Sequence, residues 1–102
     1  MNALKTLHSE IMTRVCKRLA DIYHVSKVVY EVGEANAKFK EQRGEGWLEM
    51  TIYNYGNRGN LKCYLSRYGN RRGGDYKSLL SGGTTEHLYA AINKLIAERE
   101  QP

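Results

Sequence analysis

The residues with the clearest chemical potential lie at positions 58–77, where basic side chains and tyrosines are interspersed. The segment holds six basic residues and one acid, so it carries a net charge of +5, equal to that of the whole 102-residue chain. The basic residues are Arg58, Lys62, Arg67, Arg71, Arg72 and Lys77. Guanidinium and ammonium groups neutralise phosphates, and aromatic rings stack on bases. Tyr and Arg also anchor protein–protein hot spots, so the segment predicts a binding surface for either class of partner.

Two alternating runs of residues must position these side chains. In residues 47–55 and 61–68, apolar side chains alternate with polar and aromatic ones, which is the pattern of half-buried β-strands. The five residues 56–60 between them are turn formers and predict an antiparallel hairpin. Its buried face would carry Leu48, Met50, Ile52, Leu61, Cys63 and Leu65. Its open face would carry Trp47, Tyr53, Tyr55, Lys62, Tyr64 and Tyr68.

The rest of the chain predicts two helices and one more strand. Residues 2–23 repeat apolar side chains every three or four positions, and Thr84 or Thr85 can cap a second helix. Residues 25–32 alternate and are β-branched, which indicates a strand. We therefore expect one α+β domain, residues 1–102, with N- and C-terminal helices packed on one face of a three-stranded antiparallel sheet. Residues 33–46 are polar and fit either a long connection or an arm of a hairpin, and residues 69–83 are rich in Gly, Arg and Ser. Neither segment is counted as a strand of this sheet.

One short sequence occurs twice. Tyr-Gly-Asn-Arg stands at residues 55–58 and again at residues 68–71, each time at the end of an alternating run. Gly-Asn is favourable turn chemistry, which by itself explains two copies. The alternative interpretation is that two matched turns present an arginine beside a tyrosine at one edge of the sheet.

Two families of nucleic-acid-binding domain share part of the expected order of elements. The helix–three strands–helix order resembles the double-stranded RNA-binding domain, although residues 81–86 replace the lysines with which that family clamps phosphates. The residues that fit its first strand and loop are Tyr30, Gly33, Asn36 and Phe39. Residues 47–97 also resemble integrase-type DNA-binding domains, in which three strands enter the major groove and a C-terminal helix backs them. Both resemblances imply nucleic-acid binding.

The sequence lacks recognisable catalytic spacing, so we expect a non-enzymatic protein without a metal or a small-molecule cofactor. No Ser–His–Asp, Cys–His or paired-carboxylate arrangement can be identified. His8 lies on the apolar stripe of the first helix, which favours a core position. Cys16 and Cys63 lack metal-ligand spacing and fall on apolar faces, which indicates reduced thiols in a cytoplasmic protein. No apolar run approaches the length of a membrane span.

Two functions from different classes fit these features. The first is a nucleic-acid-binding module in which Arg67, Arg71 and Arg72 neutralise phosphates while the open face stacks bases. The second is a small inhibitor, of the phage or mobile-element type, that binds a host nuclease or a defence nucleoprotein complex through the same face. The concentration of charge favours the first. Packing between cross-strand neighbours, or cover by residues 69–83, would remove the aromatic face from either use.

Overall fold

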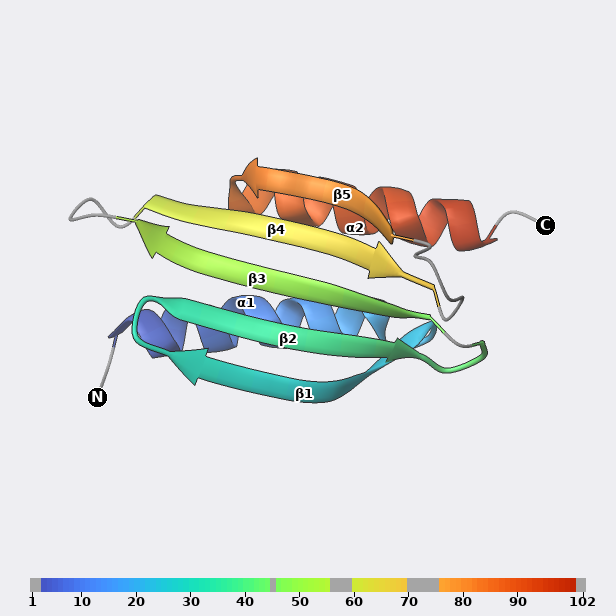
Figure 1. The fold of residues 1–102 in the computed structure, drawn as a ribbon, viewed down its shortest axis with the longest axis horizontal. Helices are drawn as coiled ribbons and strands as arrows, with labels where there is room; N and C mark the ends of the chain where they lie inside the picture. Colours follow the sequence, from blue (N-terminus) through green and yellow to red (C-terminus); the bar gives the residue numbers. More distant parts are fainter. Residues whose placement is uncertain (1–2, 45, 56–59, 70–75, 101–102) are drawn as a thin grey trace.

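The chain folds into five strands between two helices (Figure 1). The structure is a computed structural model that describes residues 3–44, 46–55, 60–69 and 76–100. The elements, in order, are α1 (Ala3–Leu19), β1 (Tyr23–Glu31), β2 (Glu34–Glu41), β3 (Trp47–Tyr55), β4 (Asn60–Tyr68), β5 (Tyr76–Gly83) and α2 (Thr85–Glu100). The strands form one antiparallel sheet in the order β1-β2-β3-β4-β5, so each strand pairs with its neighbours in sequence.

The expected three-stranded sheet is therefore wrong, because the sheet has five strands. One additional strand, β2, lies within residues 33–46. Its inward side chains Ala35, Ala37 and Phe39 are buried, and they alternate with more exposed polar residues. Alanine is small and has a low preference for strands, so the alternation is weak in sequence although it is clear in the structure.

The other additional strand, β5, lies within residues 69–83. Its pairing with β4 shifts register twice, between Cys63 and Leu65 and between Leu65 and Ser66, so its side chains do not follow a simple period of two. Gly83 ends the strand in a crowded position, where a Cβ atom would lie 2.5 Å from a methyl group of Leu80. Gly83, one of the glycines that made this segment resemble a loop, is thus required by close packing.

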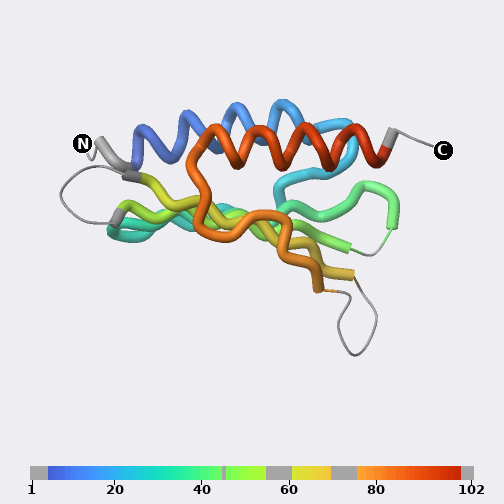
Figure 2. Tube along the Cα trace, turned by 90° about the horizontal axis from the view of Figure 1, so that it is seen from above, coloured from blue at the N-terminus to red at the C-terminus, as the bar shows by residue number. Residues whose placement is uncertain are grey.

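Both helices cover the same face of the sheet, as expected (Figure 2). The prediction that the 47–68 hairpin contributes the centre of the core is confirmed, since Leu48, Met50, Ile52, Cys63 and Leu65 are fully buried while Leu61 is partly buried. The helices bury the following residues against them: Ile11, Met12, Val15, Leu19, Leu88, Ile92 and Leu95. The opposite face of the sheet carries no helix among the described residues.

The ends of the helices follow from local chemistry. The first helix stops at Leu19, earlier than the predicted Tyr23, which instead begins β1 and is buried. Of the two threonines predicted as possible caps, Thr84 caps the second helix, because its Oγ1 accepts a hydrogen bond of 3.2 Å from the backbone N–H of His87. The Nδ1 atom of His87 accepts one of 3.2 Å from the Thr84 N–H in return. Neither helix, over the residues described, has the length and apolar character needed to cross a membrane.

Candidate binding surface

The face of the sheet opposite the helices is the candidate functional surface, and we call it the open face. The alternation of β3 places Trp47 and Tyr53 on it, while Leu48 and Ile52 point to the core. Residues directly opposite in an antiparallel pair share a face. The register Trp47↔Tyr68, Thr51↔Tyr64 and Tyr53↔Lys62 therefore brings the described members of the predicted set together on this face. The side chain of Tyr55 lies outside the described residues.

Three aromatic rings and one lysine form a row that crosses the open face at right angles to the strands. We call it the aromatic row, and it consists of Lys38, Trp47, Tyr68 and Tyr76. These residues come from β2, β3, β4 and β5 respectively. The rings of Trp47 and Tyr68 are stacked, with centroids 5.1 Å apart and planes inclined by 8°. The ammonium of Lys38 lies 4.3 Å from the centroid of the Trp47 ring, and the Tyr76 ring lies 5.2 Å from that of Tyr68 at a tilt of 55°.

The packing of the row determines what it can present to a partner. One ring stacks on Trp47 and a cation also binds this ring, so the faces of Trp47 are engaged within the protein. These ring faces are therefore already in contact with other side chains of the protein. Tyr76, at the end of the row on the edge strand, is the exception because it is 56% exposed.

Hydrogen bonds hold the tyrosines of the row in place. Burial raises the pKa of Tyr68, and so does Glu49, which accepts a hydrogen bond from its hydroxyl. The hydroxyl of Tyr76 lies 3.4 Å from the Oγ of Ser66. The Nε1 of Trp47 is buried without a hydrogen-bond partner among the residues that the structure describes. The row is thus a fixed group of side chains, most of whose polar atoms are already oriented.

Tyr53 and Tyr64 form a second aromatic contact on the open face. Their ring centroids lie 5.6 Å apart, and their planes are almost perpendicular at 86°. Lys62, directly opposite Tyr53 in the register, is exposed. This pair lies toward the end of β3 and the start of β4, away from the row, so the predicted aromatic face divides into two clusters.

Arg67, one of the predicted phosphate ligands, lies on the helix side of the sheet. It pairs in register with the buried Leu48, and its Nη2 donates a hydrogen bond of 2.8 Å to Oε1 of Glu41. Arg99 of α2 donates to the same oxygen. Burial alone would lower the pKa of Arg67, but hydrogen bonds to Glu41 and Tyr23 raise it. The guanidinium of Arg67 thus remains charged, and it already forms an ion pair with the buried carboxylate of Glu41.

Of the other predicted cations that the structure describes, Lys62 lies opposite Tyr53 and Lys77 lies on the helix side. Lys77 pairs in register with Arg67 and lines a small hollow beside α2, of about 140 Å³, together with Lys94 and Glu98. Arg58, Arg71 and Arg72 lie outside the described residues. The two Tyr-Gly-Asn-Arg sequences begin at the last residue of β3 and the last residue of β4, which are at opposite ends of the sheet. The two turns themselves, at residues 56–59 and 70–75, lie outside the described residues.

Three members or neighbours of the row were not predicted from the sequence: Lys38, Glu49 and Tyr76. Lys38 belongs to the strand that was not predicted. A signal existed for Tyr76, since Gly-Gly-Asp precedes it and such residues favour a turn leading into a hairpin partner. Glu49 shares its face with Trp47 by simple alternation, and only the structure shows its bond to Tyr68.

A shallow depression of about 510 Å³ lies beside the row, over β1, β2 and β3. Its floor is polar, because Thr51 donates a hydrogen bond of 2.6 Å to Asn36, which donates one of 2.9 Å to Glu34. Its charged lining residues are Lys27, Glu31, Glu34, Lys38 and Glu49. Cations and carboxylates are thus mixed here, so the described part of the open face is not a uniformly basic surface.

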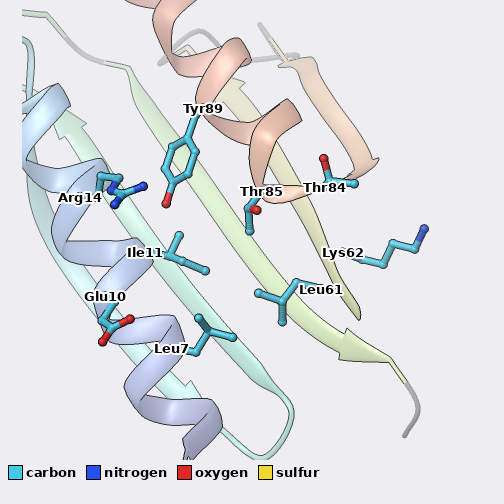
Figure 3. A pocket seen from close by; sticks show the side chains of 9 residues that line it. All are labelled: Leu7, Glu10, Ile11, Arg14, Leu61, Lys62, Thr84, Thr85 and Tyr89. Atoms are coloured by element: carbon cyan, nitrogen blue, oxygen red, sulfur yellow. The ribbon is translucent and has the colours of Figure 1, made fainter. Parts of the chain in front are cut away.

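A hollow of about 750 Å³ lies on the other side of the sheet between α1 and α2 (Figure 3). Leu7, Ile11 and Leu61 give it an apolar floor, and the guanidinium of Arg14 lies 5.3 Å from the ring centroid of Tyr89 at one end. Its lining pairs no nucleophile with a base, so its chemistry is that of a groove between packed helices.

Cys63 and His8, whose side chains could be reactive, are each buried in the core. Burial raises the pKa of the Cys63 thiol to about 11, which keeps it protonated at neutral pH. Burial lowers the pKa of His8, which is 1% exposed and belongs to the core as predicted. Within the described ranges, no three His, Cys, Asp or Glu residues are grouped so that they could hold a metal ion.

Comparison with known proteins identified no relative. No family model, no curated protein and no solved structure matches the chain. The resemblances to RNA- and DNA-binding domains both rested on a three-stranded order, which is not the order of this sheet. The function must therefore be inferred from the open face itself.

Proposed function

We propose that this protein is a non-enzymatic binding module that docks onto a protein partner through the aromatic row of its open face. The observation that carries the proposal is the parallel stack of Trp47 on Tyr68, with Lys38 over the Trp47 ring. A base that stacks needs an accessible ring face, and these contacts engage the faces of Trp47. A protein interface instead uses Trp and Tyr as rigid apolar anchors, whose edges and hydroxyls contact the partner.

The rigidity of the row supports this use. Ordering a side chain at an interface costs about 0.5–1.5 kcal/mol, and a ring that is already fixed avoids much of this cost. Trp47 is held by two neighbours in the row, and Tyr68 is held by its stack and by Glu49. The row therefore has the composition and the preorganisation of an interaction hot spot.

Charge indicates the chemistry of the partner. Lys38 and Lys40 lie at the β2 end of the row, and the whole chain carries a net charge of +5. A partner surface with an apolar pocket and an acidic rim would complement this arrangement. Proteins that process nucleic acids, or that belong to defence nucleoprotein complexes, are the partners we favour, and the protein would act on them as a small inhibitor. The free thiols of Cys16 and Cys63 support a location in the reducing cytoplasm.

The proposal is tested by capturing partners from a host lysate in which nucleic acids have been digested by nuclease. We expect the wild-type chain to retain a partner protein after the digestion. The variants Trp47→Ala and Tyr76→Ala should not retain this partner. Tyr89→Ala is the matched control, because it removes an aromatic ring from the helix side and should not change capture. Loss of every captured protein on nuclease treatment, or equal loss in the control, would contradict the proposal.

Nucleic-acid binding is the second candidate, and one observation favours it. Tyr76 is 56% exposed and directly follows residues 70–75, which contain Arg71 and Arg72. Proteins that bind single strands combine rings on which bases stack with cations that follow the backbone. A mobility-shift series with single-stranded and duplex DNA and RNA at two salt concentrations tests this candidate. If Arg71 and Arg72 contact phosphates, replacing both should make the salt slope shallower by about 2 for a duplex.

A further inference from the structure

The exposed edge of the sheet at β1 shows a self-complementary pattern of charge. In the described sheet β1 pairs only with β2, so the backbone groups on its other side have no strand partner (Figure 1). Its second half is regular, with Lys27 to Glu31 paired residue by residue to β2. Lys27, Val29 and Glu31 point to the open face, where they line the polar depression.

Within one molecule, the two charged residues of this half-strand face like charges. Lys27 lies directly opposite Lys38 of β2, and Glu31 lies directly opposite Glu34. Like charges in directly opposed positions destabilise a sheet. Neither Lys27 nor Glu31 has an ion-pair partner in the part of the chain that the structure describes. Both charges are therefore available to a second strand.

We propose that two copies of this chain associate through β1, in antiparallel register centred on Val29, to form a continuous ten-stranded sheet. In this register Lys27 of each copy lies opposite Glu31 of the other, and Val29 lies opposite its own counterpart. Val28 then lies opposite Tyr30 on the helix side, where both are partly buried. Two cross-strand ion pairs and an apolar centre form without any change in either molecule.

The neighbouring registers are less favourable. Centring on Lys27 or on Glu31 would place that residue opposite its own like charge, and centring on Val28 or Tyr30 leaves both charges without an opposite partner. A two-fold axis perpendicular to the sheet keeps both pairs of helices on one side. The open faces of the two copies then form one surface that carries two aromatic rows.

Edge strands are usually protected against association, and the first half of β1 is protected. The register shifts between Val25 and Lys27, and the Ser26 hydroxyl donates a hydrogen bond of 3.1 Å to the Lys38 carbonyl. Such a bulge interrupts further pairing. The opposite edge, β5, has two register shifts in its pairing with β4. The regular half of β1 is thus the better site for a second copy.

Sedimentation velocity of the full chain over a range of concentrations tests the proposal. Wild type should show a reversible monomer–dimer equilibrium. Lys27→Glu and Glu31→Lys should each weaken it by roughly tenfold or more, because each places two like-charged pairs across the interface. The double variant Lys27→Glu/Glu31→Lys restores opposite charges, so its Kd should return to within about threefold of wild type.

Lys40→Glu is the matched control, since it makes the same charge change on the open face of β2 and should leave the Kd unchanged. Circular dichroism checks that each variant is folded. A wild-type chain that stays monomeric at millimolar concentration would overturn the proposal. A dimer that survives the single reversals, or that the double variant fails to restore, would overturn it as well.

Discussion

Arg67 of β4 reaches Glu41 of β2 over the intervening strand β3, and the two side chains form a hydrogen bond of 2.8 Å. The chain just before β3 must leave room for this contact. A Cβ atom at Gly46 would lie 2.9 Å from Oε1 of Glu41 and 2.8 Å from the carbonyl oxygen of Tyr68. Arg99 completes the cluster from α2, so one buried carboxylate joins three parts of the fold.

Glu41 should therefore matter more for stability than either arginine. We expect Glu41→Ala to lower the free energy of unfolding by roughly 1–3 kcal/mol, because it leaves two guanidinium groups without their acceptor. Arg67→Ala should cost less, since Arg99 still binds the carboxylate. Urea denaturation measures both changes, with Glu98→Ala on the exposed side of α2 as the control. A larger cost for Arg67→Ala than for Glu41→Ala would contradict this account.

The buried ring of Phe39 distinguishes the five-stranded sheet from the three-stranded one. Phe39 is 1% exposed on β2, so Phe39→Ala should cost about 3–5 kcal/mol in the free energy of unfolding. Val32→Ala, at a residue 99% exposed, should change it by less than about 0.5 kcal/mol. Thermal and urea unfolding of the two variants give the comparison. A Phe39→Ala variant as stable as wild type would mean that β2 is not part of the core.

The sequence predicted the central hairpin because its signals agreed. Residues 47–55 and 61–68 alternate strictly, and turn formers separate them, so both the strands and their buried face were correct. The strand β2 was missed because two of its three apolar core residues are alanines. The strand β5 was missed because glycines and adjacent leucines replace alternation where the register shifts. Alternation of apolar and polar residues in the sequence does not reveal a strand whose position depends on the strands that it pairs with.

The site was predictable only in part, for a related reason. Alternation correctly placed Trp47 and Tyr68 on one face, but the parallel stack between them depends on the register that only pairing defines. Arg67 was assigned to a binding stripe because it lies among basic residues in sequence. Its parity with Cys63 and Leu65 already indicated the helix side, where the structure shows it. Clustering of charge along a strand does not place charges on one face.

His8 should make stability depend on pH. Burial holds the folded-state pKa of His8 below the ordinary value of 6.5, so below that pH the unfolded chain binds more protons than the folded one. Stability should therefore fall as the pH decreases through 6.5, by at most about 1.4 kcal/mol per pH unit from this residue. Urea titrations between pH 7.5 and 5, values chosen to bracket about 6.5, measure this.

The variant His8→Leu should remove this part of the pH dependence, whereas His24→Gln should not, since His24 is exposed. Parallel stability curves for wild type and His8→Leu over this range would show that burial of His8 does not couple folding to pH.

Trp47 is the only tryptophan, so its fluorescence reports on the aromatic row directly. Tyr68→Ala removes the ring stacked on it and should shift the emission of Trp47 to longer wavelength, because water reaches the indole. Tyr64→Ala removes a ring from the other aromatic cluster and should leave the emission unchanged. Equal shifts in the two variants would mean that Tyr68 does not shield Trp47.

The most direct test of the proposed function is a fluorescence titration of Trp47 with two kinds of ligand. Single-stranded and duplex oligonucleotides should leave its emission unchanged, because the faces of the indole are already engaged by Tyr68 and Lys38. The second ligand is the protein that remains captured from lysate after nuclease treatment, purified as a variant without tryptophan. It should shift the emission of Trp47 to shorter wavelength as the row is buried. Saturable quenching of Trp47 by an oligonucleotide, without a shift from the captured protein, would contradict the account and identify nucleic acid as the partner.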